Sequence, residues 1–269
     1  TVHGSYFEQY TNFVVKRLPW NFFLVKIFFF FWRWYFFFLE KIAIKNVDRY
    51  IFITKHLQLY YSSIFDVKKR LGTVIYNGIK KENEVSDLKE KDRKKLSAII
   101  IGSNFYLKGL DIALNSIEKI NSSNSVKKKI QLNIIGFDDF YKFISKKKVP
   151  NFVNYIGRVN SDQVSAWIQK SDFLLFPSRH EGFPLSILEA IQLKIPVIVS
   201  EACKFEEIPN SEKIGIAVQG YKIKNWEDNV IILTKKILFF QKNLEGLNMK
   251  PFFWEKIAEE YLHVFNEEN

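Results

Sequence analysis

From about residue 97 onward, the sequence alternates between short β-rich apolar runs and amphipathic stretches of helix length. The apolar runs are Ala98–Ile101, Gln131–Ile135, Asn151–Ile156, Asp172–Phe176 and Pro196–Val199, and the helix-length stretches are Leu110–Ile120, Gln163–Lys170 and Leu185–Leu193. Continuous apolar strands separated by helices predict a parallel sheet that is covered on both faces. We therefore expect a doubly wound α/β domain, in which ligands bind at the carboxyl ends of the strands.

The first 80 residues differ from the rest, because they hold only short β-rich segments. Thr1–Gly4 reads like the end of a strand, Val47–Thr54 predicts a second strand, and Thr73–Tyr76 predicts a third before the turn at Asn77 and Gly78. If each strand–helix unit takes about 30 residues, we expect that roughly a hundred residues of a first α/β domain are absent.

Between these segments lies Phe22–Leu39, in which Lys26 and Arg33 are the only charged residues. Two central charges would destabilise a membrane-spanning helix by roughly 5–7 kcal/mol, and its apolar residues would stabilise it by roughly 4–8 kcal/mol. Hydropathy alone therefore does not decide whether this segment crosses a membrane. A spanning helix would separate the flanking strands into different compartments, where they could not share a sheet. We therefore expect a helix that is buried in the domain, packed between domains, or lying on a membrane surface, with Lys26, Arg33 and Glu40 on one polar stripe.

The chain has a formal net charge of +11 and a single cysteine, Cys203. A basic surface suits nucleic acid, an anionic membrane or a phosphate-bearing substrate, and the absence of a nucleic-acid-reading motif argues against the first. One cysteine excludes an internal disulfide framework and a cysteine-based zinc site, and it fits a reducing, cytoplasmic setting.

The segment that follows the run Asp172–Phe176 carries the residues best suited to bind a ligand. Gly182 permits close approach of a ligand to the backbone, and Pro184 suits the start of a helix, whose free N–H groups bind anions. Glu181 and Glu189 flank this turn, and a carboxylate can accept two hydrogen bonds from neighbouring hydroxyls of a sugar or a ribose. Either glutamate alone would suit an ordinary surface role, but the pair around Gly-Phe-Pro predicts a site for a diphosphate between two sugars.

The segment Glu181–Glu189 (EGFPLSILE) resembles the E-x7-E signature of the retaining glycosyltransferases of the GT-B fold, family four, the glycosyl transferases group 1. Further stretches that resemble this family, in its order, are Val74–Ile79, Gly102–Leu110, Val153–Val159 and Asp172–Ser178. The resemblance runs from about residue 47 to 220. It implies a partial N-terminal, acceptor-side domain (1–76), a complete Rossmann-like domain that binds the nucleotide sugar (77–250), and a C-terminal helix (251–269) whose aromatic residues pack back on the first domain.

The resemblance also implies roles for single residues. Glu181 would contact the hydroxyls of the donor sugar, Glu189 would contact the ribose, and Lys108 would bind the diphosphate. His3 would lie beside the transferred sugar. Glu181, Lys108 and His3 are thus the candidate catalytic residues, and the candidate donor-binding residues are Gly102, Ser103, Lys108, Arg158, Gly182, Phe183, Pro184 and Glu189. A plain surface role remains an alternative for Lys108, His3 and Arg158.

The chain departs from the family pattern at Ser103, where many relatives carry an arginine. The diphosphate site then lacks one cation, so we expect that Arg179 or another basic residue compensates or that affinity falls. The absent first strands usually carry a glycine-rich loop and much of the acceptor site.

The resemblance implies transfer of a hexose-type sugar from a nucleoside-diphosphate sugar to an acceptor hydroxyl, with retention, and without a metal or another cofactor. The basic charge and the Phe-rich helix indicate a lipid-linked or saccharide acceptor, an anionic membrane surface as partner, and a cytoplasmic position at the inner membrane face, in the synthesis of cell-surface polysaccharide or glycolipid. The alternatives are a non-catalytic nucleotide-sugar-binding remnant and a sugar-nucleotide epimerase of the same fold. No motif fixes the donor nucleotide or its sugar.

Overall fold

The computed structural model describes residues 23–65, 72–81, 94–123, 125–144 and 148–266. Contacts divide the chain into two compact units. Unit 1 contains the chain through Gly78, the short run His180–Phe183 and the chain from Trp254 onward; unit 2 contains Ile79–Arg179 and Pro184–Phe253. The expected strand at Thr1–Gly4, with His3, lies outside the described residues.

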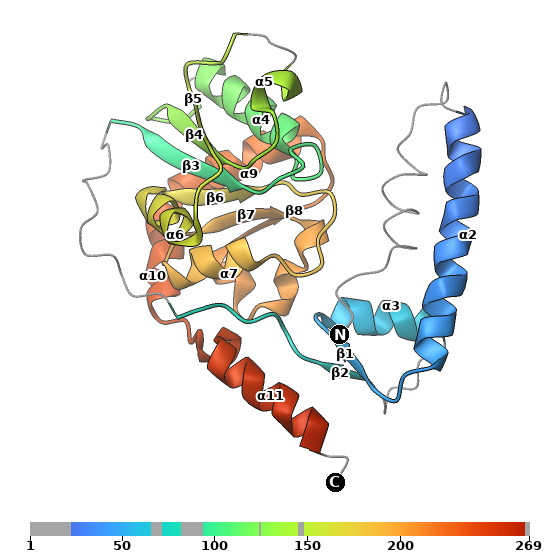
Figure 1. Ribbon diagram of the computed structural model, residues 1–269. Coiled ribbons are helices and arrows are strands. Elements are labelled where there is room, and N and C mark those ends of the chain that lie inside the picture. The colour runs from blue at the N-terminus through green and yellow to red at the C-terminus, as the bar shows by residue number, and fades with distance from the viewer. Residues whose placement is uncertain (1–22, 66–71, 82–93, 124, 145–147, 267–269) are drawn as a thin grey trace. The chain divides into compact units, whose positions relative to one another are not determined.

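Unit 2 is built on one sheet of six parallel strands (Figure 1). The strands are β3 (Leu96–Ile101), β4 (Ile130–Ile135), β5 (Val153–Gly157), β6 (Phe173–Phe176), β7 (Val197–Ser200) and β8 (Gly215–Val218). Their order across the sheet is β5-β4-β3-β6-β7-β8. The chain therefore starts in the middle of the sheet, winds to one edge, returns, and winds to the other edge, so the predicted doubly wound fold is confirmed.

Helices cover both faces of this sheet. The helices of unit 2 are α4 (Leu110–Ser123), α5 (Phe140–Phe143), α6 (Ser161–Lys170), α7 (Leu185–Gln192), α8 (Ser211–Ile214), α9 (Ile223–Lys235) and α10 (Ile237–Glu245), with short 3₁₀ turns η4 (Glu201–Cys203), η5 (Phe205–Glu207) and η6 (Lys250–Phe252). In Figure 1, α4 and α9 lie together on one face and α6 and α7 on the other. This placement is the one that right-handed crossovers between parallel strands require.

Local sequence accounts for where these elements begin. Helix α6 starts at a capping box, in which the Asn160 side chain accepts from the backbone N–H of Gln163 and the Gln163 side chain accepts from that of Asn160. Strand β5 begins at Val153, two residues later than predicted, because the Val153 N–H closes a turn onto the carbonyl of Pro150. The predicted strands and helices of this unit are all present, and β8 is a strand that the sequence pattern did not predict.

Unit 1 contains a two-stranded parallel sheet and helices from both ends of the chain. Its elements are α2 (Phe23–Lys45), β1 (Tyr50–Phe52), α3 (Lys55–Phe65), β2 (Gly72–Val74) and α11 (Trp254–Asn266). Each strand has three residues, and both are shorter than predicted. An isolated pair of short strands is marginally stable, so the sheet depends on the residues that pack against it.

Helix α11 supplies part of that packing through aliphatic side chains. Ile257 and Val264 are buried in one cluster with Ile51 and Ile75. The expectation that aromatic residues of this helix pack on unit 1 is confirmed for Tyr261, which packs against this cluster, and for Trp254, whose indole lies against Gly78. It is wrong for Phe265, which is 61% exposed. A single buried stripe is enough to hold an amphipathic helix, and the Phe265 ring lies off that stripe.

Helix α2 is longer than the predicted Phe22–Leu39, and its described side chains are largely exposed. Eight large apolar side chains, Phe30, Phe31, Trp32, Trp34, Tyr35, Phe38, Leu39 and Ile42, are between 39% and 67% exposed. A helix buried in the domain is therefore wrong for this part of the chain, whereas packing between domains and contact with a membrane surface stay predictions. The side chains of Lys26 and Arg33 lie outside the described part. Among the described residues, no helix combines the length and hydropathy needed to cross a membrane.

Candidate functional site

The carboxyl ends of β3 and β6 are the point at which the strand order of unit 2 reverses. Open α/β sheets bind ligands in the crevice at such a switch point. The loop after β3 contains Gly102 and Gly109, and the loop after β6 begins at Pro177. Gly109 has a φ of +73°, and a Cβ there would lie 2.1 Å from the carbonyl oxygen of Pro177. Only glycine allows the two loops to approach this closely.

Lys108 lies where these two loops meet. A Cβ on Gly102, whose φ is +132°, would lie 2.8 Å from the Lys108 Cε, so the methylene chain of Lys108 packs directly on this glycine. The Lys108 Nζ is 5.1 Å from the ring centroid of Phe176, the last residue of β6. The ammonium group is therefore held at the carboxyl ends of β3 and β6, and its predicted contact with a diphosphate stays a prediction.

The backbone of the loop after β3 is fixed by hydrogen bonds of its own. Asn104 adopts a left-handed conformation with φ of 56°. Its side-chain oxygen accepts from Leu107 N at 3.1 Å, and its carbonyl accepts from Lys108 N at 2.9 Å. The N–H of Phe105 donates to Asp138 Oδ2 at 2.7 Å. These bonds give Ser103, which is partly exposed, and Lys108 a defined backbone position.

Tyr155 of β5 holds Asp138, the residue after β4 that accepts from the N–H of Phe105. Its hydroxyl donates to the carbonyl of Asp138 at 3.0 Å, and its ring stacks on Phe140 with centroids 4.8 Å apart. Burial raises the pKa of Tyr155, and the negative charges of Asp139 and Asp138 raise it further. The hydroxyl therefore remains protonated and keeps donating to the Asp138 carbonyl throughout the neutral range.

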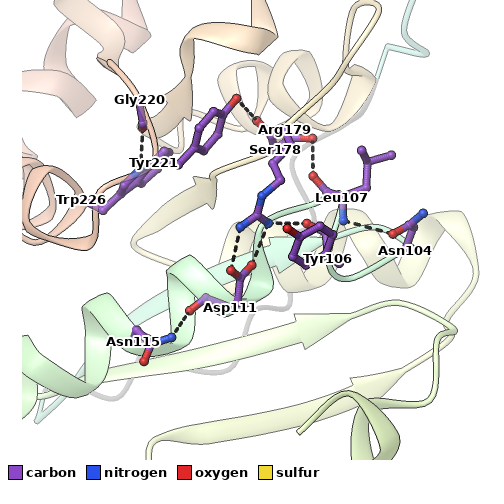
Figure 2. A network of polar contacts seen from close by, with 10 residues as sticks. All are labelled: Asn104, Tyr106, Leu107, Asp111, Asn115, Ser178, Arg179, Gly220, Tyr221 and Trp226. Carbon is purple, nitrogen blue, oxygen red and sulfur yellow. Dashed lines mark hydrogen bonds and ion pairs between the residues drawn. The ribbon is translucent and has the colours of Figure 1, made fainter. Parts of the chain in front are cut away.

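A bidentate ion pair connects the loop after β6 to helix α4. Figure 2 shows the guanidinium group of Arg179 facing both carboxylate oxygens of Asp111, at 2.8 Å and 2.7 Å. The same group donates to the carbonyl of Tyr106 and lies 4.2 Å from the centroid of its ring. The Arg179 side chain is 8% exposed and that of Asp111 is 36% exposed. Burial alone would lower the pKa of Arg179, but the hydrogen bonds and charge of Asp111 outweigh it and raise the pKa.

This pairing corrects the expectation that Arg179 replaces the cation missing at Ser103. A guanidinium whose two terminal nitrogens bind one carboxylate is neutralised by it. The backbone N–H of Arg179 also donates to the carbonyl of Leu107 at 2.8 Å. Arg179 therefore holds the loop after β3 in place rather than adding a free positive charge.

A third loop, after β8, joins this network (Figure 2). The Tyr221 hydroxyl donates to the carbonyl of Ser178 at 3.2 Å, and the Ser178 hydroxyl donates to the carbonyl of Leu107 at 3.2 Å. The indole N–H of buried Trp226 donates to the carbonyl of Gly220 at 3.1 Å. Side chains and backbone thus tie together the loops that follow β3, β6 and β8.

Helix α7 begins directly after Pro184, which occupies the capping position with extended backbone angles. No side chain caps this helix terminus. Its first N–H groups are therefore not bonded to a capping side chain and offer partial positive charge to an anion. Glu189 lies in the second turn of α7 and is partly buried.

The preceding residues, Gly182 and Phe183, belong to unit 1 together with Glu181. The Phe183 carbonyl accepts from Asn77 Nδ2 at 3.2 Å, and its ring lies 5.2 Å from that of Tyr76. Glu181 is partly buried. Because Glu181 and Glu189 belong to different units, the predicted cradle formed by the two carboxylates stays a prediction.

Arg158 is exposed just after β5, and its guanidinium carbon is 5.7 Å from the ring centroid of Phe137, which follows β4. Both residues lie at the same carboxyl edge of the sheet as Lys108, because all six strands are parallel. His3 lies outside the described residues. The sequence pattern did not indicate Asp111, Asn104 or Asp138. A charged or amide side chain shortly after a predicted strand could have indicated such residues. The group that each one contacts, however, depends on which strands are neighbours in the sheet.

Comparisons with known proteins agree with this geometry. The family model described as glycosyl transferases group 1 matches residues 81–237. An uncharacterized glycosyltransferase of Methanocaldococcus jannaschii is 28% identical over 240 residues, which cover 84% of this chain and 62% of that protein. The O-antigen biosynthesis glycosyltransferase WclY of Escherichia coli is 25% identical over 284 residues, which cover 99% of this chain and 70% of that protein.

Solved structures show the same fold. TarM superposes with a TM-score of 0.69 at 21% identity, covering 84% of this chain and 46% of that one. WaaG, a glycosyltransferase involved in lipopolysaccharide biosynthesis, superposes with a TM-score of 0.64 at 16% identity, covering 75% of this chain and 60% of that one. The chain thus spans roughly half to two thirds of the length of most of these relatives. Since the family model matches more than half of the chain, this protein belongs to the glycosyl transferases group 1, with the α/β fold of the GT-B type.

Proposed function

We propose that this chain provides the donor-binding part of a retaining glycosyltransferase, which moves a hexose-type sugar from a nucleoside-diphosphate sugar to an acceptor hydroxyl. One observation carries the proposal. Within unit 2, Lys108 and the start of α7 both lie at the carboxyl edge of the sheet, where β3 and β6 meet. A cation and free helix N–H groups at a switch point are suited to a diphosphate.

The chemistry of transfer explains why these groups are needed. Negative charge grows on the nucleoside diphosphate as the bond to the sugar breaks, and preorganised positive groups stabilise that charge. Lys108 and the amides of Gly182, Phe183 and the first turn of α7, which begins after Pro184, would do so without a metal ion or another cofactor. Gly102 and Ser103 would line the diphosphate from the other side.

The remaining candidate residues would orient the donor. In this proposal Glu189 accepts hydrogen bonds from the ribose, Glu181 accepts them from the transferred sugar, and Arg158 lies near the base. His3 would lie beside the transferred sugar. Carboxylates suit these tasks because one carboxylate can accept from two neighbouring hydroxyls.

The names of relatives support a role in cell-surface polysaccharide or glycolipid synthesis. WclY is named for O-antigen biosynthesis, and a Salmonella typhimurium relative, 22% identical over 178 residues, is named an O-antigen chain mannosyltransferase. We propose a lipid-linked or saccharide acceptor, reached from the cytoplasmic side of an anionic membrane. The exposed aromatic side chains of α2 support contact with such a surface, since a large exposed apolar patch marks an interaction site.

A thermal-shift panel of uridine, guanosine and adenosine diphosphates and their sugars tests the proposal. We expect one nucleotide to stabilise the protein, by about 2.7 kcal/mol at one hundred times its dissociation constant. Glu181→Ala should keep the thermal stabilisation by the bare nucleoside diphosphate and lose the additional stabilisation by the attached sugar. Identical responses of wild type and Glu181→Ala would show that the assigned role of Glu181 is wrong.

Product analysis separates the proposal from its alternatives. A transferase forms a glycosylated acceptor and leaves the sugar nucleotide unchanged when the acceptor is omitted. An epimerase of the same fold would release a changed sugar nucleotide without any acceptor. A nucleotide-sugar-binding remnant would give the thermal shift with neither product.

A further inference from the structure

A cavity lies at the amino ends of β3, β4 and β5, at the edge of the sheet opposite the candidate donor site in unit 2. It has a volume of about 570 Å³, which is within the range of small-molecule sites. Strand β3 has six residues, so the two edges of the sheet are separated by about 20 Å at ~3.3 Å per residue. The cavity is therefore separate from the candidate donor site, and its ligand chemistry does not depend on the proposed function.

Three lysines from three different segments face this cavity. Lys95 precedes β3, Lys129 precedes β4, and Lys148 precedes β5, whereas the lining contains one carboxylate, Glu118. Lys129 Nζ donates to the carbonyl of Asn121 near the end of α4. Among the residues that the structure describes, Lys95 and Lys148 form no ion pair. The lining thus carries a net charge of +2, from three lysines and one glutamate.

Neighbouring residues extend the positive field around the cavity. Lys94, Lys127 and Lys128 adjoin the lining lysines in sequence and are exposed. Lysine ammonium groups on flexible stems bind phosphate as point charges, with three donors each. A concave wall strengthens their combined field relative to a flat surface, because field lines focus in a cleft.

The rest of the lining is not charged. Val149, Pro150 and Phe152 form an apolar wall, and the amides of Gln131 and Asn151 add hydrogen-bonding groups that suit hydroxyls. An aromatic and apolar wall beside amide groups is suited to a sugar-like body, which has both C–H faces and hydroxyls. A bare inorganic anion would leave this part of the cavity unused.

We propose that this cavity binds a phosphate monoester with a compact uncharged body, such as a sugar phosphate, at a site distinct from the donor site. The phosphate would lie among Lys95, Lys129 and Lys148, and the body would lie against Phe152. The phosphate group could come from a free metabolite or from a lipid headgroup, and the test distinguishes the two.

Calorimetric titrations with inorganic phosphate, glucose 6-phosphate and glucose, at constant ionic strength and with excess uridine diphosphate, test this proposal. Glucose 6-phosphate should bind at least tenfold more tightly than phosphate, and glucose should not bind measurably. Lys95→Gln combined with Lys148→Gln should weaken binding of glucose 6-phosphate by about 10- to 100-fold. Lys235→Gln combined with Lys242→Gln, which removes the same charge from positions outside the cavity, should leave it unchanged.

Cosedimentation with vesicles that contain phosphatidic acid, whose headgroup is a phosphate monoester, provides the second arm. Binding of glucose 6-phosphate that depends on the cavity lysines supports the proposal, and additional lysine-dependent vesicle binding assigns the phosphate to a lipid headgroup. Vesicle binding without glucose 6-phosphate binding would overturn the proposal and leave only a basic surface. Equal loss of binding in both double variants would also overturn it, because net charge alone would then account for the effect.

Discussion

At the scale of single residues, Asp111 and Arg179 hold the loops after β3 and β6 together. Their two hydrogen bonds are joined by backbone and ring contacts of Arg179 with Leu107 and Tyr106. Because the Arg179 side chain is almost fully buried, loss of Asp111 would leave a poorly solvated charge. The ion pair therefore fixes the positions of these two loops, and this role does not require either side chain to contact the donor.

A double-mutant cycle on Asp111→Ala and Arg179→Ala tests this role. We expect each substitution to lower the free energy of unfolding by about 1–3 kcal/mol, toward the lower end because Asp111 is partly exposed, with a coupling energy of about 1 kcal/mol or more. Denaturant unfolding monitored by circular dichroism measures both. The exposed pair Lys256 and Glu259 in α11 is the matched control and should show no measurable coupling. Equal coupling in the two pairs would contradict the account.

At the scale of elements, the close approach of the loops after β3 and β6 depends on the backbone at Gly109. Alanine there would require a left-handed φ and would place a Cβ 2.1 Å from the Pro177 carbonyl oxygen. Both effects act on the folded state, and neither can be relieved by moving a flexible side chain. The loop that carries Lys108 would have to move away from β6.

Gly109→Ala should therefore lower the free energy of unfolding by more than about 2 kcal/mol. Gly246→Ala is the control, since Gly246 follows α10 with φ of −90° and has open space where a Cβ would be. That substitution should be neutral or should stabilise by up to about 1 kcal/mol, through the lower entropy of the unfolded chain. Chemical denaturation of both variants measures the difference, and similar losses would refute the steric argument.

Helix α2 allows a second test at this scale. Phe31 and Phe38 are 67% and 57% exposed, so replacing both by serine should change the free energy of unfolding by less than about 0.5 kcal/mol each. The same change should reduce cosedimentation with phosphatidylglycerol vesicles. Leu238→Ser with Phe239→Ser, at exposed positions of α10 in unit 2, is the matched control. Unchanged vesicle binding by the α2 variant would argue against membrane contact through this helix.

At the scale of the whole molecule, the two units differ in how much structure supports them. Unit 2 has a six-stranded sheet with buried residues on both faces, whereas unit 1 has two strands of three residues. Unfolding in a single transition is therefore not expected. Local stability should follow the number of buried apolar contacts and the pairing of strands.

Native-state hydrogen exchange should show this difference directly. Amides of Ile99, Ile100, Leu132 and Leu174, all fully or nearly fully buried in the sheet of unit 2, should exchange slowest. Amides of β1 and β2 should exchange at least tenfold faster through a separate opening of unit 1. Equal protection in both sheets, with the same dependence on denaturant, would show that the molecule unfolds as one cooperative unit.

The sequence predicted unit 2 well because β3, β4, β5 and β6 are apolar runs that end at glycine or proline. It did not reveal β8, which has only four residues and begins at Gly215. The sequence also did not predict the ion pair between Asp111 and Arg179. This pair forms because β3 and β6 are neighbours in the sheet, although three helices and two strands separate them in the chain. The sequence left burial in the domain, packing between domains and contact with a membrane surface as alternatives for α2, because a mostly apolar helix with a narrow polar stripe suits all three.

The central claim is that the carboxyl edge of β3 and β6 binds the diphosphate of a nucleotide sugar. An NMR titration with uridine, guanosine and adenosine diphosphates, following backbone amides, tests it most directly. We predict that one nucleotide shifts the amides of Ser103, Lys108 and Leu185, and that Lys108→Gln raises its dissociation constant at least tenfold while exposed Lys213→Gln does not. No shifts at these amides up to millimolar nucleotide, or shifts confined to the amino edge of the sheet, would contradict the account.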